Sequence, residues 1–349
     1  MNADDPQQVL RVTLDDVERV ARADISPLPQ QPSSGAKSYG NIAEPAAPVL
    51  AQQKGSILLQ AWFYLGSAGL VGSLLAWSIA ERGFVDAERG RWGNTWMLPM
   101  IVTLMCVGFA VAESLIERSL KKVLTRGALS LPLGIAFGFV FDGIANAFYA
   151  IALSLCKAAG AQTFRNPAVW LARGFAWAVF GAAGGIVYGI VGRSMKKTAF
   201  GVLGGAIGAV LGGTIFDPIS FATHGGAPSR AIGFGLLGLA TGVGMGLVEN
   251  ALKDRWLYVT AGPLAGKQFI LYKPQTTIGS DQSCDIYLFK DPQIEPDHAV
   301  LQLKASRIYL LAKGVAYISG QPVRGPQILE SGATIQMGRY SFRYQEKER

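Results

Sequence analysis

Polar and apolar stretches alternate along the chain on the scale of whole domains. Residues 1–55 are polar, six apolar segments lie between 57 and 248, and residues 256–349 contain short alternating runs. A membrane-spanning helix needs about 20 mostly apolar residues. The pattern therefore predicts six spanning helices, at about 57–80, 97–116, 129–154, 169–191, 199–219 and 231–248. The last two segments are short and glycine-rich, but six such runs in succession leave no polar faces for water, which disfavours soluble helices.

The distribution of basic residues predicts the orientation of these helices. Lysine and arginine are denser after the second, fourth and sixth segments than in the alternate loops. The residues concerned are Arg118, Lys121, Lys122 and Arg126, then Arg193, Lys196 and Lys197, then Lys253 and Arg255. The side of the membrane with more Lys and Arg is normally cytoplasmic. We therefore expect a multi-pass protein of the cell membrane with both termini in the cytoplasm.

An internal repeat groups the segments into pairs. Arg118-Ser-Leu-Lys-Lys122 returns 75 residues later as Arg193-Ser-Met-Lys-Lys197, and an aspartate follows each lysine pair by 20 residues, at Asp142 and Asp217. We infer three tandem helical hairpins, each entering and leaving the membrane on the cytoplasmic side. Parallel repeats of this kind occur in transporters, but duplicated hairpins also build simple scaffolds.

Four acidic residues lie in or near the apolar segments and are candidates for function, because an acid inside the membrane costs about 2.5–3.5 kcal/mol on insertion scales. They are Glu113, Asp142, Asp217 and Glu249. A helix rises 1.5 Å per residue, so 20 residues after a lysine pair correspond to about 30 Å and place both aspartates at the outer interface. Glu113 and Glu249 fall near the cytoplasmic ends, close to Arg118 and Lys253. The alternative is an ion or proton path lined by Asp142 and Asp217.

The composition is that of a membrane protein, and it argues against several kinds of partner and site. Half of the residues are hydrophobic, 16% are charged, and there are 43 glycines, a residue that lets membrane helices approach closely. The net charge is +8, and the basic residues lie mostly at the ends of the apolar segments and in the last domain. Membrane topology explains this distribution, so we expect no nucleic-acid partner. Three cysteines and two histidines without ligand spacing predict neither a metal site nor a disulfide framework. No motif for a cofactor or for catalysis is present, so we expect no cofactor and no enzyme.

The first 55 residues lack the apolar core of a signal peptide. They predict a cytoplasmic tail with one short amphipathic helix from Thr13 and a disordered linker rich in Pro, Gln, Ser and Ala. Residues 56–252 form the predicted six-helix domain. From 256 to 349, seven short runs of alternating residues are separated by glycine and proline turns, which is typical of an all-β sandwich or barrel.

The motifs of this last segment resemble the forkhead-associated (FHA) family of β-sandwich domains. Thr277-Ile-Gly279 followed by Cys284-Asp-Ile286 resembles the family's first loop and next strand. Ile294 to Ala299 is similar to its Ser-x-x-His turn, and Ile318-Ser-Gly320 to its Val-Asn-Gly turn. Leu329 to Phe342 is similar to its closing run. The resemblance implies an FHA-like sandwich over nearly all of 256–349, in a family that binds phosphothreonine peptides.

The residues that hold phosphate in this family are replaced here. Ser280 stands where the family places an arginine, Glu295 where it places a serine, and Lys313 where it places an asparagine. A guanidinium that binds phosphate bidentately is lost, and a carboxylate stands beside the phosphate position. We infer that phosphothreonine binding is lost or strongly altered. His298 matches a histidine that is mainly structural in the family.

These patterns lead to two functional hypotheses. In the first, the helices anchor an FHA-like domain that recruits or regulates a cytoplasmic protein, a phosphoprotein being one candidate, through the loops around Ser280, Glu295, His298, Lys313 and Ser319. In the second, the hairpins form a channel or transporter gated by this domain. The bilayer is a partner in both, and stripes such as Gly201, Gly205, Ala209 and Gly213 could pack within the chain or between copies of a homo-oligomer.

Overall fold

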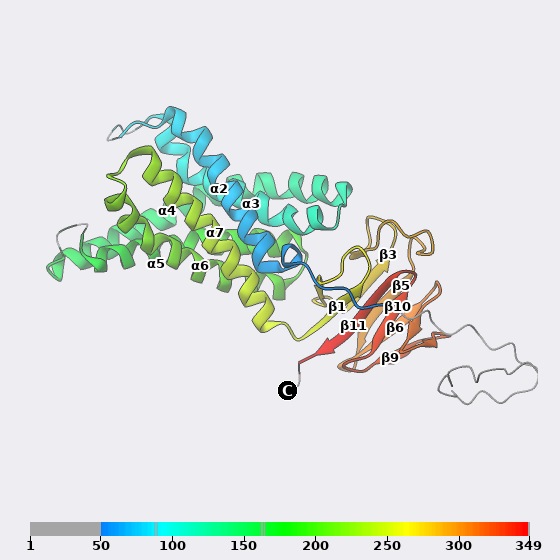
Figure 1. Cartoon of the computed structure of the whole chain (residues 1–349). Coiled ribbons are helices and arrows are strands. Elements are labelled where there is room, and N and C mark those ends of the chain that lie inside the picture. Colours follow the sequence, from blue (N-terminus) through cyan, green and yellow to red (C-terminus); the bar gives the residue numbers. More distant parts are fainter. Residues whose placement is uncertain (1–49, 87, 89, 162, 164, 348–349) are drawn as a thin grey trace, which may run out of the picture. The chain divides into compact units, whose positions relative to one another are not determined.

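The structure is a computed structural model that describes residues 50–86, 88, 90–161, 163 and 165–347. The amphipathic helix predicted from Thr13 lies outside the described residues. The described chain consists of a helical domain followed by an all-β domain, as the sequence patterns predicted (Figure 1).

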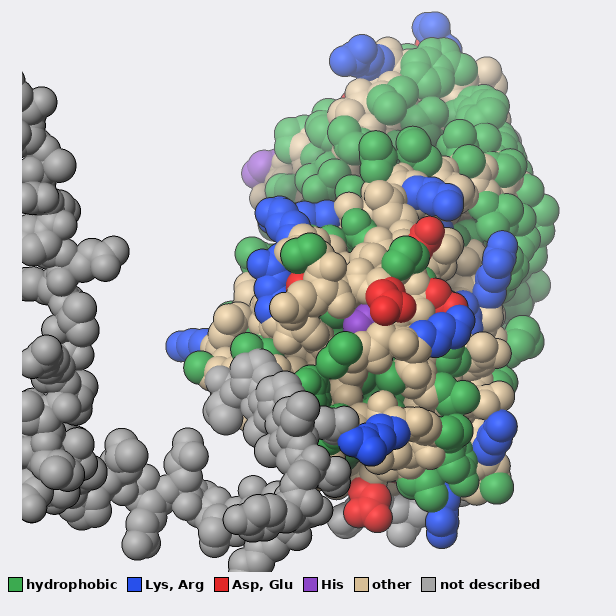
Figure 2. Space-filling view, turned by 90° about the vertical axis from the view of Figure 1, so that its right-hand side faces the viewer, with side chains coloured by type: hydrophobic (Ala, Val, Ile, Leu, Met, Phe, Trp, Pro, Cys, Tyr) green, Lys and Arg blue, Asp and Glu red, His purple; other side chains and the backbone are tan. Residues whose placement is uncertain are grey.

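Six helices of the helical domain are long and apolar enough to cross a membrane. They are α2 (Ala61–Ala80), α3 (Trp92–Ile116), α4 (Leu120–Ala158), α5 (Pro167–Val191), α6 (Met195–Ala222) and α7 (Gly226–Leu252), and two short 3₁₀ helices, η1 (Ile57–Leu59) and η2 (Glu81–Gly83), flank α2. The predicted number of helices is confirmed. Hydrophobic side chains cover a large continuous part of the surface (Figure 2), as expected of a surface that meets lipid.

Several helices extend beyond the apolar segments because polar caps start them earlier. Ser119 and Ser194 accept hydrogen bonds from the amides of Lys122 and Lys197, so α4 and α6 begin before their apolar runs do. A serine at this position supplies an acceptor for an amide that has no partner inside the helix. The two segments that look short in the sequence are full-length helices of 28 and 27 residues; Ser194 caps the first, whereas the second begins at Gly226 without a side-chain cap.

The two copies of the repeated motif have the same local structure. Arg118 and Arg193 have left-handed backbone angles, with φ of 54° and 52°, and each ends one helix just before a capping serine starts the next. In both turns the amide of the serine donates to a carbonyl five residues earlier, at 3.1 Å. This six-residue closure is typical of a helix C-terminus with a left-handed residue. The α3–α4 and α5–α6 turns lie at the end of the bundle that also contacts the β-domain, which we call the β-domain end.

The six helices pack in a closed ring. Each helix packs against the next in the chain, and α7 returns to α2. The centre of the ring is filled: Phe109 of α3 is fully buried, and its ring lies against Gly69 of α2 and Gly184 of α5. Met105, Phe180 and Met245 belong to the same buried core.

Glycines let α6 pack closely on both of its neighbours. A Cβ atom at Gly205 would lie 2.3 Å from the carbonyl oxygen of Gly181 in α5, and one at Gly208 would lie 2.1 Å from that of Ala240 in α7. The stripe of Gly201, Gly205, Ala209 and Gly213 packs on α5, within the chain. Small residues allow this backbone approach, from which membrane helices gain van der Waals contact.

The β-domain is a sandwich of two sheets with strand orders β2-β1-β11-β10-β7-β8 and β4-β3-β5-β6-β9 (Figure 1). The strands are β1 (Arg255–Ala261), β2 (Gln268–Ile270), β3 (Gln275–Gly279), β4 (Ile286–Tyr287), β5 (Ala299–Lys304), β6 (Arg307–Ala312), β7 (Tyr317–Ile318), β8 (Gln321–Pro322), β9 (Gln327–Leu329), β10 (Thr334–Met337) and β11 (Tyr340–Glu346). The seven alternating runs of the sequence are all strands. Four strands are not among these runs: β3, which was read only as part of a family motif, and β7, β8 and β9, which carry too few alternating positions to be recognised.

Replacing Gly181 with alanine should destabilise the bundle. The new methyl group would lie 2.0 Å from the carbonyl oxygen of Gly205, so α5 and α6 must separate. Overpacking of this kind costs about 1–3 kcal/mol. Gly143→Ala on the open face of α4 is the control, because nothing lies within 4 Å of its added methyl group. We expect a lower Tm in detergent for Gly181→Ala only; equal Tm values for the two variants would contradict the packing.

Candidate functional site

Hydrogen bonds of the backbone join three loops at one end of the β-domain. We call them the recognition loops: residues 280–285 between β3 and β4, 288–298 between β4 and β5, and 313–316 between β6 and β7. The amides of Ser280 and Asp281 donate to the carbonyl oxygens of Glu295 and Pro296, at 2.9 and 3.2 Å. The first loop therefore depends on the second for its position.

His298 joins the second loop to the third. Its side chain is 1% exposed, Nδ1 accepts from the amide of Glu295 at 3.1 Å, and Nε2 lies 3.0 Å from the carbonyl oxygen of Val315. Because Nδ1 accepts, Nε2 carries the proton and donates to Val315. The backbone oxygen of His298 accepts from the amides of Lys313 and Gly314. Both ring nitrogens are occupied by backbone groups, which is the arrangement of a structural histidine.

The structure brings together four of the five loop residues selected from the sequence, namely Ser280, Glu295, His298 and Lys313. Ser319 is not bonded to them. It lies in the β7–β8 turn with φ of 48°, and its amide donates to the carbonyl oxygen of Thr334 in β10, the strand that pairs with β7. The Lys313 ammonium forms an ion pair with the Asp297 carboxylate, and both side chains are about half exposed.

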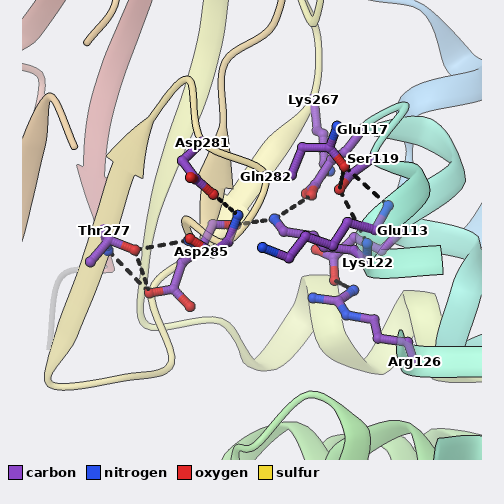
Figure 3. A network of polar contacts seen from close by, with 12 residues as sticks. Glu113, Glu117, Ser119, Lys122, Arg126, Lys267, Thr277, Asp281, Gln282 and Asp285 are labelled. Atoms are coloured by element: carbon purple, nitrogen blue, oxygen red, sulfur yellow. Dashed lines mark hydrogen bonds and ion pairs between the residues drawn. The ribbon is translucent and has the colours of Figure 1, made fainter. Parts of the chain in front are cut away.

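The first recognition loop also contacts the membrane helices (Figure 3). Gln282 Oε1 accepts from the amide of Lys121 at 3.0 Å and from the hydroxyl of Ser119 at 3.3 Å. These groups form the N-terminus of α4, where the first amides have no partner within the helix. The β-domain therefore supplies part of the cap of a membrane helix.

A buried ion cluster lies beside this contact. Glu117, at the end of α3, accepts from Lys267 of the β1–β2 turn at 2.7 Å and from Lys122 of α4 at 3.0 Å. The side chains of Glu117 and Lys267 are 2% and 1% exposed. Lys122 also donates to the carbonyl oxygen of Asp285. We call Glu117, Lys122, Lys267 and Asp285 the junction cluster.

The carboxylate of Asp285 is held in its ionised form within the β-domain. Burial alone raises its pKa, but hydrogen bonds from Lys273 at 2.6 Å and from the amide of Thr277 at 3.1 Å outweigh burial. The pKa of Asp285 is therefore below its ordinary value. The loop whose carbonyl receives Lys122 is thus fixed on its other side by an ion pair.

The two acids expected near the cytoplasmic ends have partners other than the expected ones. Glu113 pairs with Lys197 of α6 at 3.0 Å and with Arg126 of α4 at 3.3 Å, not with Arg118. Glu249 accepts from the hydroxyls of Tyr188 in α5 and Tyr272 in the β-domain, not from Lys253. Burial and the nearby Glu249 carboxylate raise the pKa of Tyr272, so this phenol stays protonated and can donate.

A cavity of about 100 Å³ opens between these residues, and side chains of both domains line it. Its charged lining residues are Glu113, Arg126, Lys197, Glu249, Lys273 and Asp285. Three of these residues are cations and three are carboxylates.

The two aspartates expected at the outer interface do not bond to each other. Asp217 is buried and pairs with Arg173 of α5 at 2.9 Å, and the same arginine donates to the hydroxyl of Tyr149. Asp142 accepts from Asn146, one turn further along α4, at 3.1 Å. Both acids thus have local partners at the end of the bundle opposite the β-domain end.

Sequence reasoning missed the residues that join the two domains. Glu117, Lys267 and Gln282 look like ordinary polar residues of helix ends and turns. The only available signal was the repeated lysine pair, whose second lysine is buried in both copies, at 8% exposure for Lys122 and 6% for Lys197.

Comparisons with known proteins concern the β-domain. Residues 258–348 match the family model for the cytoplasmic domain of the inner membrane component of the type III secretion system. The oxoglutarate dehydrogenase inhibitor of Corynebacterium efficiens is 32% identical over 87 residues, which are 24% of this chain and 60% of the relative. That of Corynebacterium glutamicum is 31% identical over 87 residues, 24% of this chain and 59% of the relative. The chain thus spans about 60% of the length of these curated relatives.

Solved structures similar to this chain include FHA domains. The FHA domain of the CT664 protein from Chlamydia trachomatis is 22% identical, with 28% of this chain and all of that chain covered and a TM-score of 0.26. The cytoplasmic domain of the type III secretion sorting platform protein PscD from P. aeruginosa is 25% identical, with 28% and 82% covered and a TM-score of 0.25. The two sheets of the C-terminal domain form a sandwich, which agrees with the FHA-like fold that the sequence motifs predicted.

Replacing Lys267 with methionine should strongly destabilise the junction between the domains. It removes one of the two cations of a buried carboxylate, and breaking a buried pair costs about 3–5 kcal/mol. We expect the Tm of the full chain in detergent to fall by roughly 5–10 °C. Lys313→Met is the control, because its pair is exposed and contributes about 0–1 kcal/mol. Equal falls in Tm for the two variants would show that the buried pair contributes no more to stability than the exposed pair.

Proposed function

We propose that this protein is a membrane-anchored recruitment platform, whose FHA-like domain binds a cytoplasmic protein without requiring phosphothreonine. The observation that carries this proposal is the state of the recognition loops. Their hydrogen-bonded framework, centred on the buried His298, is complete, while the side chains at the phosphate-holding positions are Ser280, Glu295 and Lys313.

The charges of the loops disfavour a phosphate group. Asp281, Glu295 and Asp297 are exposed carboxylates at this end of the domain, and the ammonium of Lys313 is already paired with Asp297. A phosphate carries close to two negative charges at neutral pH and would lie beside these carboxylates. An unphosphorylated segment of the partner is therefore the better ligand.

Val315 offers an apolar contact in the same place. Its side chain is 69% exposed, while its carbonyl oxygen is fixed by His298. A fixed, exposed valine beside exposed charged groups suits a protein interface in which an apolar residue of the partner covers it. The corynebacterial relatives are named as inhibitors of an enzyme, which agrees with a domain that acts by binding another protein.

The helical domain is best explained as the anchor. Its centre is filled by Phe109 and neighbouring core residues. Asp142 and Asp217, which the transport hypothesis required on one path, lie on helices that pack on opposite sides of α5 in the ring and bond to separate partners. Together with the basic residues of the α3–α4 and α5–α6 turns, this supports an anchor with both termini in the cytoplasm.

Photo-crosslinking tests the proposed surface. A photoreactive residue at position 315, in the full chain in living cells, should give a discrete adduct with a cytoplasmic protein. The same residue at the exposed Lys304, the last residue of β5 at the other end of the β5–β6 hairpin, is the control and should give none. An adduct from position 304 alone would contradict the surface, and an adduct with a protein outside the cytoplasm would contradict the orientation.

Restoring the family's phosphate-binding residues should restore phosphopeptide binding. The wild-type chain in nanodiscs should show no calorimetric binding to phosphothreonine peptides. The Ser280→Arg, Glu295→Ser double variant should gain at least about tenfold in affinity, because it adds charge-assisted hydrogen bonds of about 1.5–3 kcal/mol and removes a repulsive carboxylate. The unphosphorylated peptides are the control. Tight binding of a phosphothreonine peptide by the wild-type chain would refute the proposal.

A further inference from the structure

A continuous chain of hydrogen bonds runs from a membrane helix to all three recognition loops. It begins at the N-terminus of α4, where the amide of Lys121 and the hydroxyl of Ser119 donate to Gln282 Oε1 (Figure 3). It continues from the first loop to the second through the amides of Ser280 and Asp281. It reaches the third loop through His298.

The segment that carries Gln282 is a tight turn held together by two hydrogen bonds. The Asp281 carboxylate accepts from the amide of Ser283 at 2.6 Å, and the carbonyl oxygen of Asp281 accepts from the amide of Cys284 at 3.1 Å. A side chain that forms this kind of turn fixes the residues around it. A displacement of Gln282 must therefore shift Ser280 and Asp281, whose amides contact the second loop.

The repeated turn provides an internal comparison. Ser194 caps α6 as Ser119 caps α4, and it accepts from Lys197 within its own helix. The neighbouring Lys196 pairs with Asp254, before the first strand, and not with a recognition loop. Of the two equivalent turns, the α3–α4 turn is the one that Gln282 contacts.

We propose that the position of α4 sets the geometry of the recognition loops through Gln282. The contact has two states, capped and released, and release loosens the hydrogen bonds from Ser280 and Asp281 to the second loop. Coupling of this kind is reciprocal. A partner that holds the loops in another geometry therefore weakens the cap of α4, and a movement of α4 in the membrane changes the affinity for the partner.

The effect of Gln282 on the recognition loops can be tested without undocking the β-domain from the helices. The Lys267–Glu117 ion pair and the Tyr272–Glu249 hydrogen bond do not involve Gln282, so they remain when its side chain is shortened. The Gln282→Ala variant should therefore stay folded and docked. No partner has to be known for the test, so its outcome does not depend on the proposed function.

Hydrogen exchange of the full chain in nanodiscs, followed by mass spectrometry, tests the coupling. In Gln282→Ala, we expect the segments holding the amides of Ser280, Asp281, Lys313 and Gly314 to exchange about fivefold faster, the effect of losing roughly one hydrogen bond. Ser194→Ala is the matched control. It removes the cap of α6 and should leave these segments at the wild-type rate.

A conservative variant separates the acceptor role of Gln282 from general damage to the loop. Gln282→Glu keeps an oxygen acceptor and adds a negative charge at a helix N-terminus, which is favourable. It should retain wild-type protection, and core segments around Leu257 and Leu310 should stay protected in every variant. The proposal is wrong if Gln282→Ala changes exchange only at residues 119–122, or if Gln282→Glu exchanges like Gln282→Ala.

Discussion

The ion pair between Lys267 and Glu117 is the contact on which the arrangement of the two domains depends. Both side chains are almost fully buried, so neither charge can exchange its partner for water. A buried charge without a partner costs several kcal/mol, and separating the domains would expose or isolate both groups. The β-domain thus contacts the membrane helices through a buried ion pair, in addition to the hydrogen bonds of Gln282 and Tyr272.

The helices provide this fixed base because they are closely packed. Two glycine faces of α6 bring three helix backbones into contact, and Phe109 fills the ring that the six helices form. Apolar burial drives little association inside a membrane, so contact and interhelical polar bonds must supply it. Such polar bonds lie at both ends of the bundle. At the β-domain end, Glu113 joins α3 to α4 and α6, and Glu249 joins α7 to α5 and the β-domain. At the opposite end, Arg173 joins α5 to α4 and α6.

In the function that we propose, the β-domain keeps the loop framework of the FHA family but binds its partner without phosphate. His298 joins the second and third loops through both ring nitrogens, whereas Ser280, Glu295 and Lys313 stand at the positions that hold phosphate in the family. One of the same loops caps a membrane helix through Gln282. The first recognition loop is thus bonded both to the second loop and to a membrane helix, so a partner bound as we propose would be physically connected to the helices.

Local patterns in the sequence determined the number of helices, most of the strands, the FHA-like motifs and the two equivalent turns at Arg118 and Arg193. These features depend on hydrophobic period, on caps and on residues a few positions apart. The partners of the buried charges were decided only by tertiary structure: Glu113 was expected beside Arg118 and pairs with Lys197, 84 residues away. Lys267 and Gln282 resemble solvated turn residues, because sequence shows the polarity of a side chain but not which distant surface covers it. Long-range packing decides which surface covers each polar side chain, and it therefore decides which residues join the two domains.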